Sequence, residues 1–194
     1  MTRAEVLNNI RYNENLVSQY QRRINNLQQQ INSQNATINQ LCSRIDEMSS
    51  QKKKLDSQVS ELEMLKKKFG TLQNNFASRQ SKRVSSFTKN FSQNLNAHFI
   101  SAYISGMRSL LSGTEYRNAY NGLTTAIEKV LKQIRSKQEE IDGVVSRIAA
   151  VNRDIDSRRR TINSLSGQIN ETNNSLVYRR QRITYWKNQL KYAT

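Results

Sequence analysis

Proline is absent from this 194-residue chain, which also has only one cysteine, one histidine and six glycines. Without proline, the strongest helix breaker is missing along the whole length. A single cysteine, Cys42, excludes a disulfide within the chain. Apolar residues make up 36% of the sequence, too few for a thick globular core, whereas a two-helix seam needs only about two apolar residues in seven. The composition therefore predicts an all-α, elongated fold.

Residue types that form catalytic and metal sites are also scarce. His98 has no cysteine or second histidine near it in sequence, so no metal-ligand spacing exists. Acidic pairs such as Asp46-Glu47 fall on highly charged stretches, whereas acid–base carboxylates need a cleft that gives them different proton affinities. No glycine-rich phosphate loop is present. We expect no enzyme, no catalytic residue, no metal site and no cofactor.

Long apolar runs are missing as well. No stretch approaches the length of a transmembrane helix, and no apolar run follows Met1. Neither a transmembrane segment nor a Sec-type signal peptide is predicted. We therefore expect a cytoplasmic protein, with any export using a route that is independent of a signal peptide.

What the chain does contain is a seven-residue apolar repeat at each end. Such a repeat keeps its apolar residues on one face only when helices supercoil around a partner. The C-terminal repeat has ten members: Ile127, Ile134, Ile141, Ile148, Ile155, Ile162, Ile169, Leu176, Ile183 and Leu190. The N-terminal repeat comprises Ile10, Val17, Ile24, Ile31, Ile38 and Ile45, and resumes at Val59 after Lys52. The repeats predict two coiled-coil arms, residues 1–69 and 127–194.

Arms of equal length at opposite ends of one chain predict an antiparallel hairpin. In the preferred register, paired residue numbers add to 196, so that Ile31 faces Leu165. Each polar interruption then meets an apolar residue: Asn13 with Ile183, Gln34 with Ile162, Lys52 with Val144, Arg158 with Ile38, and Arg179 with Val17. Slipping by one heptad stacks Lys52 or Lys66 on Lys137, which is disfavoured by desolvation and repulsion.

Two alternatives stay open at this point. A sum of 224 places the turn inside Leu111-Ser112-Gly113-Thr114, where a glycine turn and a threonine N-cap coincide. That register leaves roughly the first 30 residues overhanging and sets Lys66 opposite Arg158. A parallel or antiparallel homodimer uses the same seams, and the sequence does not distinguish it from the hairpin.

The middle of the chain, residues 70–126, lacks an evident apolar heptad repeat and is rich in aromatic residues. We interpret it as a small helical head that Gly70 introduces, with a new helix starting near Glu115. The residues of this head that we expect to contact a partner are Phe91, Leu95, Phe99, Leu111, Gly113, Tyr116 and Tyr120. Trp186, with Tyr178, Tyr185 and Tyr192 nearby in sequence, is a second candidate for a partner-binding end.

The net charge of +16 is spread along the chain, with short basic runs such as Lys52-Lys53-Lys54 and Arg158-Arg159-Arg160. Such runs suit phosphates of nucleic acid or an anionic surface. No DNA- or RNA-reading motif accompanies them. The charge therefore favours a solvated helix surface with an acidic protein partner over nucleic-acid binding.

The segment Leu110-Leu111-Ser112-Gly113-Thr114-Glu115-Tyr116-Arg117-Asn118-Ala119-Tyr120 resembles the Trp-x-Gly/Leu-x-Gly turn of helical-hairpin proteins tied to type VII secretion. The order of coiled coil, aromatic segment, glycine turn and coiled coil also looks like the YwqH-like accessory proteins of Leu-x-Gly toxins. The resemblance implies that Leu111-Ser112-Gly113 closes the turn, and that Ala119, Leu123 and Ile127 begin the inner face of the second helix.

The resemblance further implies a non-enzymatic adaptor or chaperone that pairs with the N-terminal helical domain of a toxin. No tyrosine is followed four residues later by aspartate or glutamate, so the export signal of these families is absent, which favours an accessory role. The alternatives are a basic coiled coil associated with nucleic acid and a structural stalk of a phage or cell-envelope assembly, which predicts self-assembly.

Overall fold

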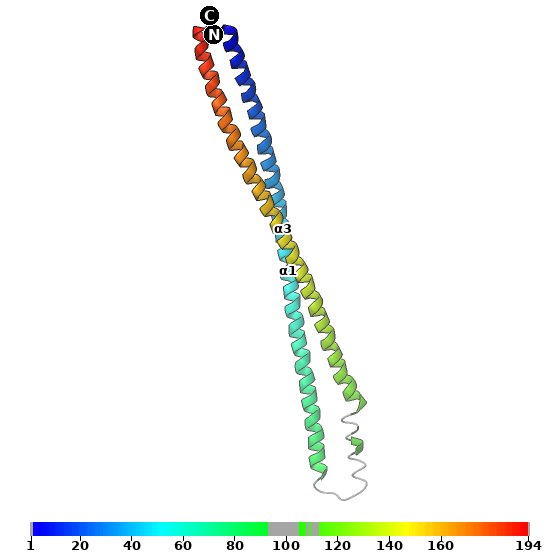
Figure 1. Ribbon diagram of the computed structural model, residues 1–194. Helices are drawn as coiled ribbons and strands as arrows, with labels where there is room; N and C mark the ends of the chain where they lie inside the picture. The colour runs from blue at the N-terminus through cyan, green and yellow to red at the C-terminus, as the bar shows by residue number, and fades with distance from the viewer. Residues whose placement is uncertain (1, 93–104, 108, 110–112, 194) are drawn as a thin grey trace. The chain divides into compact units, whose positions relative to one another are not determined.

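The computed structural model describes residues 2–92, 105–107, 109 and 113–193. Helix α1 spans Arg3–Ser92 and helix α3 spans Thr114–Gln189, and a 3-10 helix, η1, follows at Leu190–Tyr192. No strand occurs among these residues. Helix α1 packs against α3 in the opposite direction (Figure 1). The predicted all-α antiparallel helical hairpin is confirmed.

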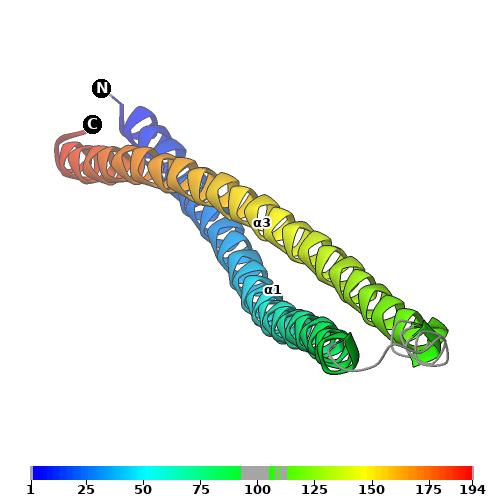
Figure 2. The same ribbon diagram turned by 90° about the horizontal axis from the view of Figure 1, so that it is seen from below.

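The packed helices divide into two units, each with a part of α1 and a part of α3. Unit 1 comprises Met1–Met48 and Ser146–Thr194, so it joins the two ends of the chain. Unit 2 comprises Ser49–Val145. Figure 2 shows the early part of α1 in blue and the late part of α3 in orange, which together form unit 1. Each unit is described separately below.

Backbone groups at the start of each helix form hydrogen bonds with the residues just before it. At the start of α1, the Thr2 hydroxyl accepts a hydrogen bond from the Glu5 amide at 3.3 Å, and the Thr2 amide donates to Glu5 Oε2 at 2.8 Å. This reciprocal pair is a capping box. At the start of α3, the Gly113 carbonyl accepts from the Arg117 amide at 3.2 Å. Gly113 therefore occupies the N-cap position, directly before the first residue of α3.

The core of unit 1 establishes the register of the two helices. Leu27, Ile31 and Leu165 form a buried cluster, with Ile162 and Ile169 packed against it. These contacts match the pairing of Ile31 with Leu165 and of Leu27 with Ile169. The register in which paired numbers add to 196 is confirmed, and the alternative sum of 224 is wrong.

In unit 2 the same heptad phase continues further than the sequence suggested. Val144 is fully buried, and Leu55, Val130 and Ile141 are also in the core. Gly70 lies inside α1 and does not end it, because the helix continues to Ser92. The predicted boundaries at 69/70 and 126/127 therefore coincide with no helix end.

The predicted seam isoleucines are all buried or half-buried: Ile10, Ile24, Ile31, Ile38, Ile45, Ile134, Ile141, Ile148, Ile155, Ile162, Ile169 and Ile183. Polar residues at seam positions are also buried, including Asn13, which is only 3% exposed. The heptad phase, rather than side-chain polarity, decides which residues face the other helix.

The register sets each polar interruption opposite an apolar residue, but two arginines of α3 also bond to polar interruptions of α1. Arg158 Nη1 donates to Gln34 Oε1 at 2.9 Å, and Arg179 Nη1 donates to Asn13 Oδ1 at 3.4 Å. Both pairs cross from α3 to α1 within unit 1. A guanidinium is long enough to reach a residue one turn away from the layer directly opposite, so the two amides are paired with the two arginines.

In unit 2, by contrast, the lysines of the seam bond within their own helix. Lys52 Nζ lies 2.7 Å from Asp56 Oδ2, and Lys137 Nζ lies 2.9 Å from Glu140 Oε1. Both ammonium groups are turned towards carboxylates outside the seam while their stems remain half-buried. A long lysine side chain can leave a seam in this way, with its stem packed and its ammonium group in solvent.

Candidate partner-binding site

The residues predicted to contact a partner fall partly within the described structure. Phe91 lies in α1, close to its C-terminal end. Leu95, Phe99 and Leu111 lie outside the described residues. Gly113, Tyr116 and Tyr120 are described and lie at or just after the start of α3. The structure thus brings three of the predicted residues to one end of unit 2.

An aromatic stack joins the two helices in this part of unit 2. The ring of Phe76, from α1, lies 5.0 Å from the ring of Tyr116, from α3, with an angle of 12° between the planes. Tyr116 in turn stacks on Tyr120, with centroids 6.1 Å apart. All three side chains are half-buried. The stack holds the start of α3 on α1 and leaves part of each ring open to solvent.

A polar contact lies beside the stack. Gln73 Nε2 donates to Thr124 Oγ1 at 2.7 Å, and the Thr124 hydroxyl donates to the Tyr120 carbonyl at 3.2 Å. Gln80 is one heptad further along α1, and its Nε2 is buried without a hydrogen-bond partner among the described residues. Glutamine thus takes the seam positions that isoleucine holds in the N-terminal repeat. This substitution explains why the hydrophobic pattern is lost from the sequence while the packing continues.

One inner-face residue implied by the family resemblance is corrected. Ala119 is exposed, whereas Leu123 and Ile127 are half-buried as expected. The heptad phase of α3 places Tyr116 and Tyr120 on the inner face, and Ala119 lies beside that face. The inner face of α3 therefore begins with an aromatic residue, Tyr116.

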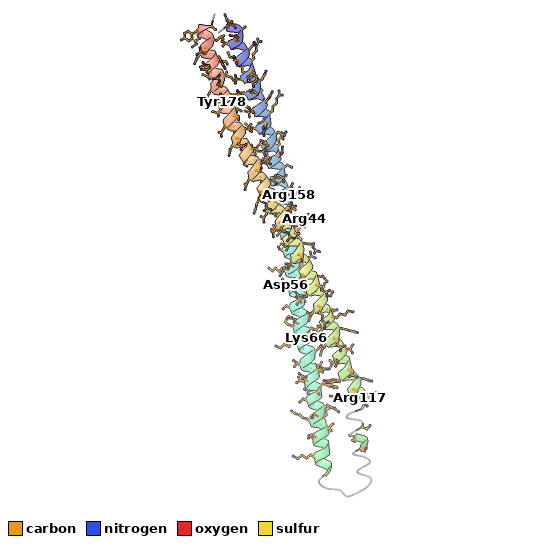
Figure 3. All side chains as sticks on the ribbon, in the orientation of Figure 1. Arg44, Asp56, Lys66, Arg117, Arg158 and Tyr178 are labelled. Atoms are coloured by element: carbon orange, nitrogen blue, oxygen red, sulfur yellow. The ribbon has the colours of Figure 1, made fainter. Side chains whose placement is uncertain are left out.

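A second group of aromatic residues lies in unit 1, and we call it the Tyr/Arg flank. It consists of Tyr12 from α1 and of five residues from α3: Tyr178, Arg179, Arg182, Tyr185 and Trp186. Figure 3 labels Tyr178 on α3 and Arg158 earlier in the same helix. Tyr12, Tyr178 and Tyr185 are 57%, 53% and 46% exposed, so the flank forms a solvent-facing surface.

Two arginines of this flank contact its aromatic rings. The Arg179 guanidinium carbon lies 5.3 Å from the centroid of the Tyr178 ring and 6.0 Å from that of Tyr12. The Arg182 carbon lies 5.0 Å from the Tyr185 ring and 5.1 Å from the Trp186 ring. These distances are those of cation–π contacts. Each guanidinium therefore contacts two aromatic rings.

The sequence contains a signal for this flank that composition alone does not reveal. Tyr178, Tyr185 and Tyr192 are spaced seven residues apart, like the seam residues, and Tyr178 and Tyr185 each stand one position before a residue of the second seam, Arg179 and Trp186. A heptad repeat of exposed aromatics beside a seam predicts a second contact stripe along the helix. The aromatic end near Trp186 was expected, but the arginines that hold its rings were not.

An open groove of about 480 Å³ also lies between the helices of unit 2. Its walls are Gln58, Glu61, Leu62 and Leu65 from α1, and Gln133, Ser136, Lys137 and Glu140 from α3. Glu140 already accepts from Lys137. The groove offers an apolar strip from Leu62 and Leu65, and its remaining charged wall residue, Glu61, is exposed and forms no ion pair among the described residues.

Metal sites, membrane-spanning helices and the cysteine are considered next, for the described part of the chain. No group of three or more metal-ligating side chains is found in residues 2–92, 105–107, 109 and 113–193. Within the same residues, no helix combines the length and apolar character that crossing a membrane requires. Cys42 is a free, exposed cysteine.

Comparison with known proteins identifies no relative: no family model, no curated protein and no solved structure matches this chain.

Proposed function

We propose that this chain is a non-enzymatic helical interaction protein, an accessory protein that pairs with a Leu-x-Gly-type toxin for type VII secretion. The observation that carries the proposal is that Gly113, the last residue of the Leu-x-Gly motif, occupies the N-cap position of α3, where its carbonyl accepts the first hydrogen bond of that helix. The motif thus ends directly before the second of two long antiparallel helices. Closure of the turn by Leu111-Ser112-Gly113, which the resemblance implies, stays a prediction, because the register in which paired numbers add to 196 is centred on residue 98.

The surface that we assign to the toxin is the Phe76–Tyr116–Tyr120 stack. Its rings are half-buried, so packing on each other leaves ring surface for an aromatic or aliphatic side chain of a helical partner. Thr124 and Gln73 bond to each other next to the stack and keep the two helices together at this point. The binding would add a helix of the toxin to an existing helix pair, and it requires no chemical step.

The experiment is to recover the protein from the cells that make it and identify what accompanies it. The proposal expects a larger protein whose N-terminal domain is helical and carries a Leu-x-Gly turn. Tyr120→Ala should reduce this recovery at least tenfold, because loss of a central aromatic contact at an interface costs about 2 kcal/mol or more. Tyr192→Ala, which changes an 82%-exposed tyrosine in η1, is the matched control and should recover the partner fully.

The same preparation tests the competing functions. Recovery of the chain alone as a homo-oligomer contradicts the proposal and supports a structural stalk. Recovery of nucleic acid that is lost as salt is raised contradicts it and supports the nucleic-acid alternative. Circular dichroism of Tyr120→Ala must match that of the unaltered chain, so that a loss of recovery reports contact rather than unfolding.

A further inference from the structure

The Tyr/Arg flank of unit 1 presents two guanidinium groups that no carboxylate of the described residues neutralises. Arg179 and Arg182 form no ion pair with a carboxylate among those residues. Each guanidinium lies over aromatic rings, and a guanidinium in a cation–π contact can still donate its N–H groups to an acceptor. Arg179 uses one N–H for Asn13, whereas Arg182 has no hydrogen-bond partner among those residues.

The carboxylates of unit 1 are few, and most are engaged elsewhere. Unit 1 contains 15 basic and 7 acidic side chains, a net charge of +8. Glu14 pairs with Lys187, and Asp154 and Asp156 lie beside arginines of the 158–160 run. Glu5 accepts from the Thr2 amide. The charge of the flank is therefore available to carboxylates of another molecule.

The spacing of the flank indicates the shape of that molecule. Tyr178 and Tyr185 are one heptad apart on α3, so their exposed rings lie on one side of the helix at roughly 10 Å separation. Arg182 lies between them, in contact with Tyr185. A ligand that meets such a stripe in register must itself repeat every seven residues, which is a property of a helix packing along a coiled coil.

We propose that the Tyr/Arg flank is a docking surface for an acidic amphipathic helix of a partner protein, whose carboxylates pair with Arg182 and Arg179. The helix would lie along α3 as a third helix of unit 1, with apolar side chains on Tyr178 and Tyr185. This inference goes beyond the proposed function, because it concerns a different surface and requires no toxin. The carboxylate–guanidinium pair gives it selectivity, since the flank itself carries only positive charge.

The geometry favours a protein over a single-stranded nucleic acid. Bases bind by stacking on open ring faces. On this flank a guanidinium already lies over Tyr178, Tyr185 and Trp186, and Trp186 meets Tyr185 at 73° with centroids 5.0 Å apart. The face of each ring that lies against a guanidinium is not open to a base, whereas Arg182 has N–H groups without a hydrogen-bond partner among the described residues, and such groups are what a carboxylate recognises.

Trp186 is the only tryptophan of the chain, so its fluorescence reports this surface directly. The probe is a synthetic helix of three heptads with leucine at the two seam positions and glutamate elsewhere, titrated into the full chain at moderate salt. We expect a saturating change in tryptophan emission. A peptide with glutamine in place of each glutamate should bind at least tenfold more weakly, because the charge-assisted hydrogen bonds are lost.

Variants then locate the binding. Arg182→Gln should weaken binding of the acidic peptide about tenfold, and Arg182→Lys should fall between the two because it keeps the charge but not the planar edge. Arg153→Gln removes the same charge from an exposed position of α3 that touches no ring of the described structure, and it should change affinity less than twofold. Each variant must retain the melting temperature of the unaltered chain.

Three results would overturn the inference. The first is equal affinity for the glutamate and glutamine peptides, and the second is a loss with Arg153→Gln as large as that with Arg182→Gln. The third is tighter, Arg182-dependent binding of an oligothymidylate, which would identify the flank as a nucleic-acid site. None of these results bears on toxin recovery, which depends on Tyr120, so failure of this inference and failure of the proposed function are separable.

Discussion

Unit 1 and unit 2 interrupt the same heptad repeat with charged side chains but satisfy those charged side chains differently. In unit 1 the contact crosses from one helix to the other, as in the hydrogen bond of 2.9 Å from Arg158 to Gln34. In unit 2 Lys52 and Lys137 bond to carboxylates of their own helix, and a cross-helix hydrogen bond of that unit joins an uncharged pair, Gln73 and Thr124. A bond within one helix forms in any register, whereas a bond across the seam forms in one register only. The charged residues of the two units therefore differ in how much they specify the pairing.

The spacing of the cross-helix pairs strengthens this difference. Asn13 and Gln34 are 21 residues apart on α1, and Arg179 and Arg158 are 21 residues apart on α3. The two contacts are therefore equivalent positions three heptads apart. A slip of one heptad breaks both at once and leaves the buried amide of Asn13 and the half-buried amide of Gln34 without these donors, which disfavours the slipped states.

Phe76 lies six heptads after Gln34 on α1, and Tyr116 lies six heptads before Arg158 on α3. The aromatic stack of unit 2 therefore occupies positions equivalent to those of Gln34 and Arg158, and its two rings are 5.0 Å apart. Unit 2 thus uses ring packing at a position where unit 1 uses an amide and a guanidinium. Ring packing is less directional than a hydrogen bond, so it stabilises the pair with less demand on register.

The largest expected effect comes from breaking the core of unit 1. Ile31→Asp combined with Leu165→Asp places two carboxylates in the buried cluster and should destabilise unit 1 by more than about 4 kcal/mol. Trp186 emission and the helical signal in circular dichroism should both fall. The exposed neighbours provide the control, since Gln30→Asp with Ser164→Asp should leave both signals unchanged. Full helicity of the core variant would contradict the hairpin.

The next effect tests the cross-helix bond itself. Arg158→Leu leaves the Gln34 amide without its donor and should cost about 1–3 kcal/mol in the free energy of unfolding. Adding Gln34→Leu should restore most of this stability, because neither polar group then needs a partner. Chemical denaturation of the single and double variants measures the coupling, and additive losses would show that the bond has no energetic role.

Lys137→Leu is the matched change in unit 2. It breaks only a contact with Glu140 on the same helix, so it should be neutral or slightly stabilising. A loss as large as that of Arg158→Leu would remove the distinction drawn between the units.

A smaller effect concerns the aromatic stack of unit 2. Tyr116→Leu keeps an apolar side chain but loses the stacking on Phe76, and it should cost about 1 kcal/mol. Hydrogen exchange should become faster in the first turns of α3 and stay unchanged in unit 1. Tyr192→Leu, at an exposed tyrosine of η1, should alter neither region. An equal change in both units would show that the stack does not act locally.

The smallest effect is expected from the exposed ion pair of unit 2. Asp56→Asn removes the partner of Lys52 and should cost only about 0.3–0.5 kcal/mol. High salt should abolish this difference, because exposed charges are screened. The contribution of Arg158 and Gln34 should persist in the same salt, since that contact is partly buried. Equal salt sensitivity of the two contacts would contradict their assignment.

Much of the fold could be predicted because periodicity reports burial directly. Isoleucine every seventh residue predicted both seams, and comparing where Lys52, Lys66 and Lys137 fall in each register selected the one that the structure has. The capping box of Thr2 and Glu5 was readable from the same sequence, since threonine followed three residues later by glutamate is its signature.

The rest could not be predicted from apolar residues alone. Gln73 and Gln80 hold seam positions in unit 2, and an amide carries no hydrophobic signal even when the packing continues around it. Tyr116 and Tyr120 were assigned to a separate head because they are aromatic, although they hold the same heptad positions of α3 as Leu123 and Ile127. Of the residues expected at the partner site, Gly113, Tyr116 and Tyr120 lie together, whereas the assignment of all seven to a partner stays a prediction.

The sequence by itself determined the helical character and the position of the seams, and it favoured the antiparallel pairing that the structure has. These properties follow from local propensity and from a repeat that each helix carries independently. The tertiary structure alone decided that Arg158 meets Gln34, that Arg179 meets Asn13, and that two arginines lie over the rings of the Tyr/Arg flank. Long polar side chains reach across more than one layer, so their partners depend on the positions of both helices and on the rotamers that packing allows.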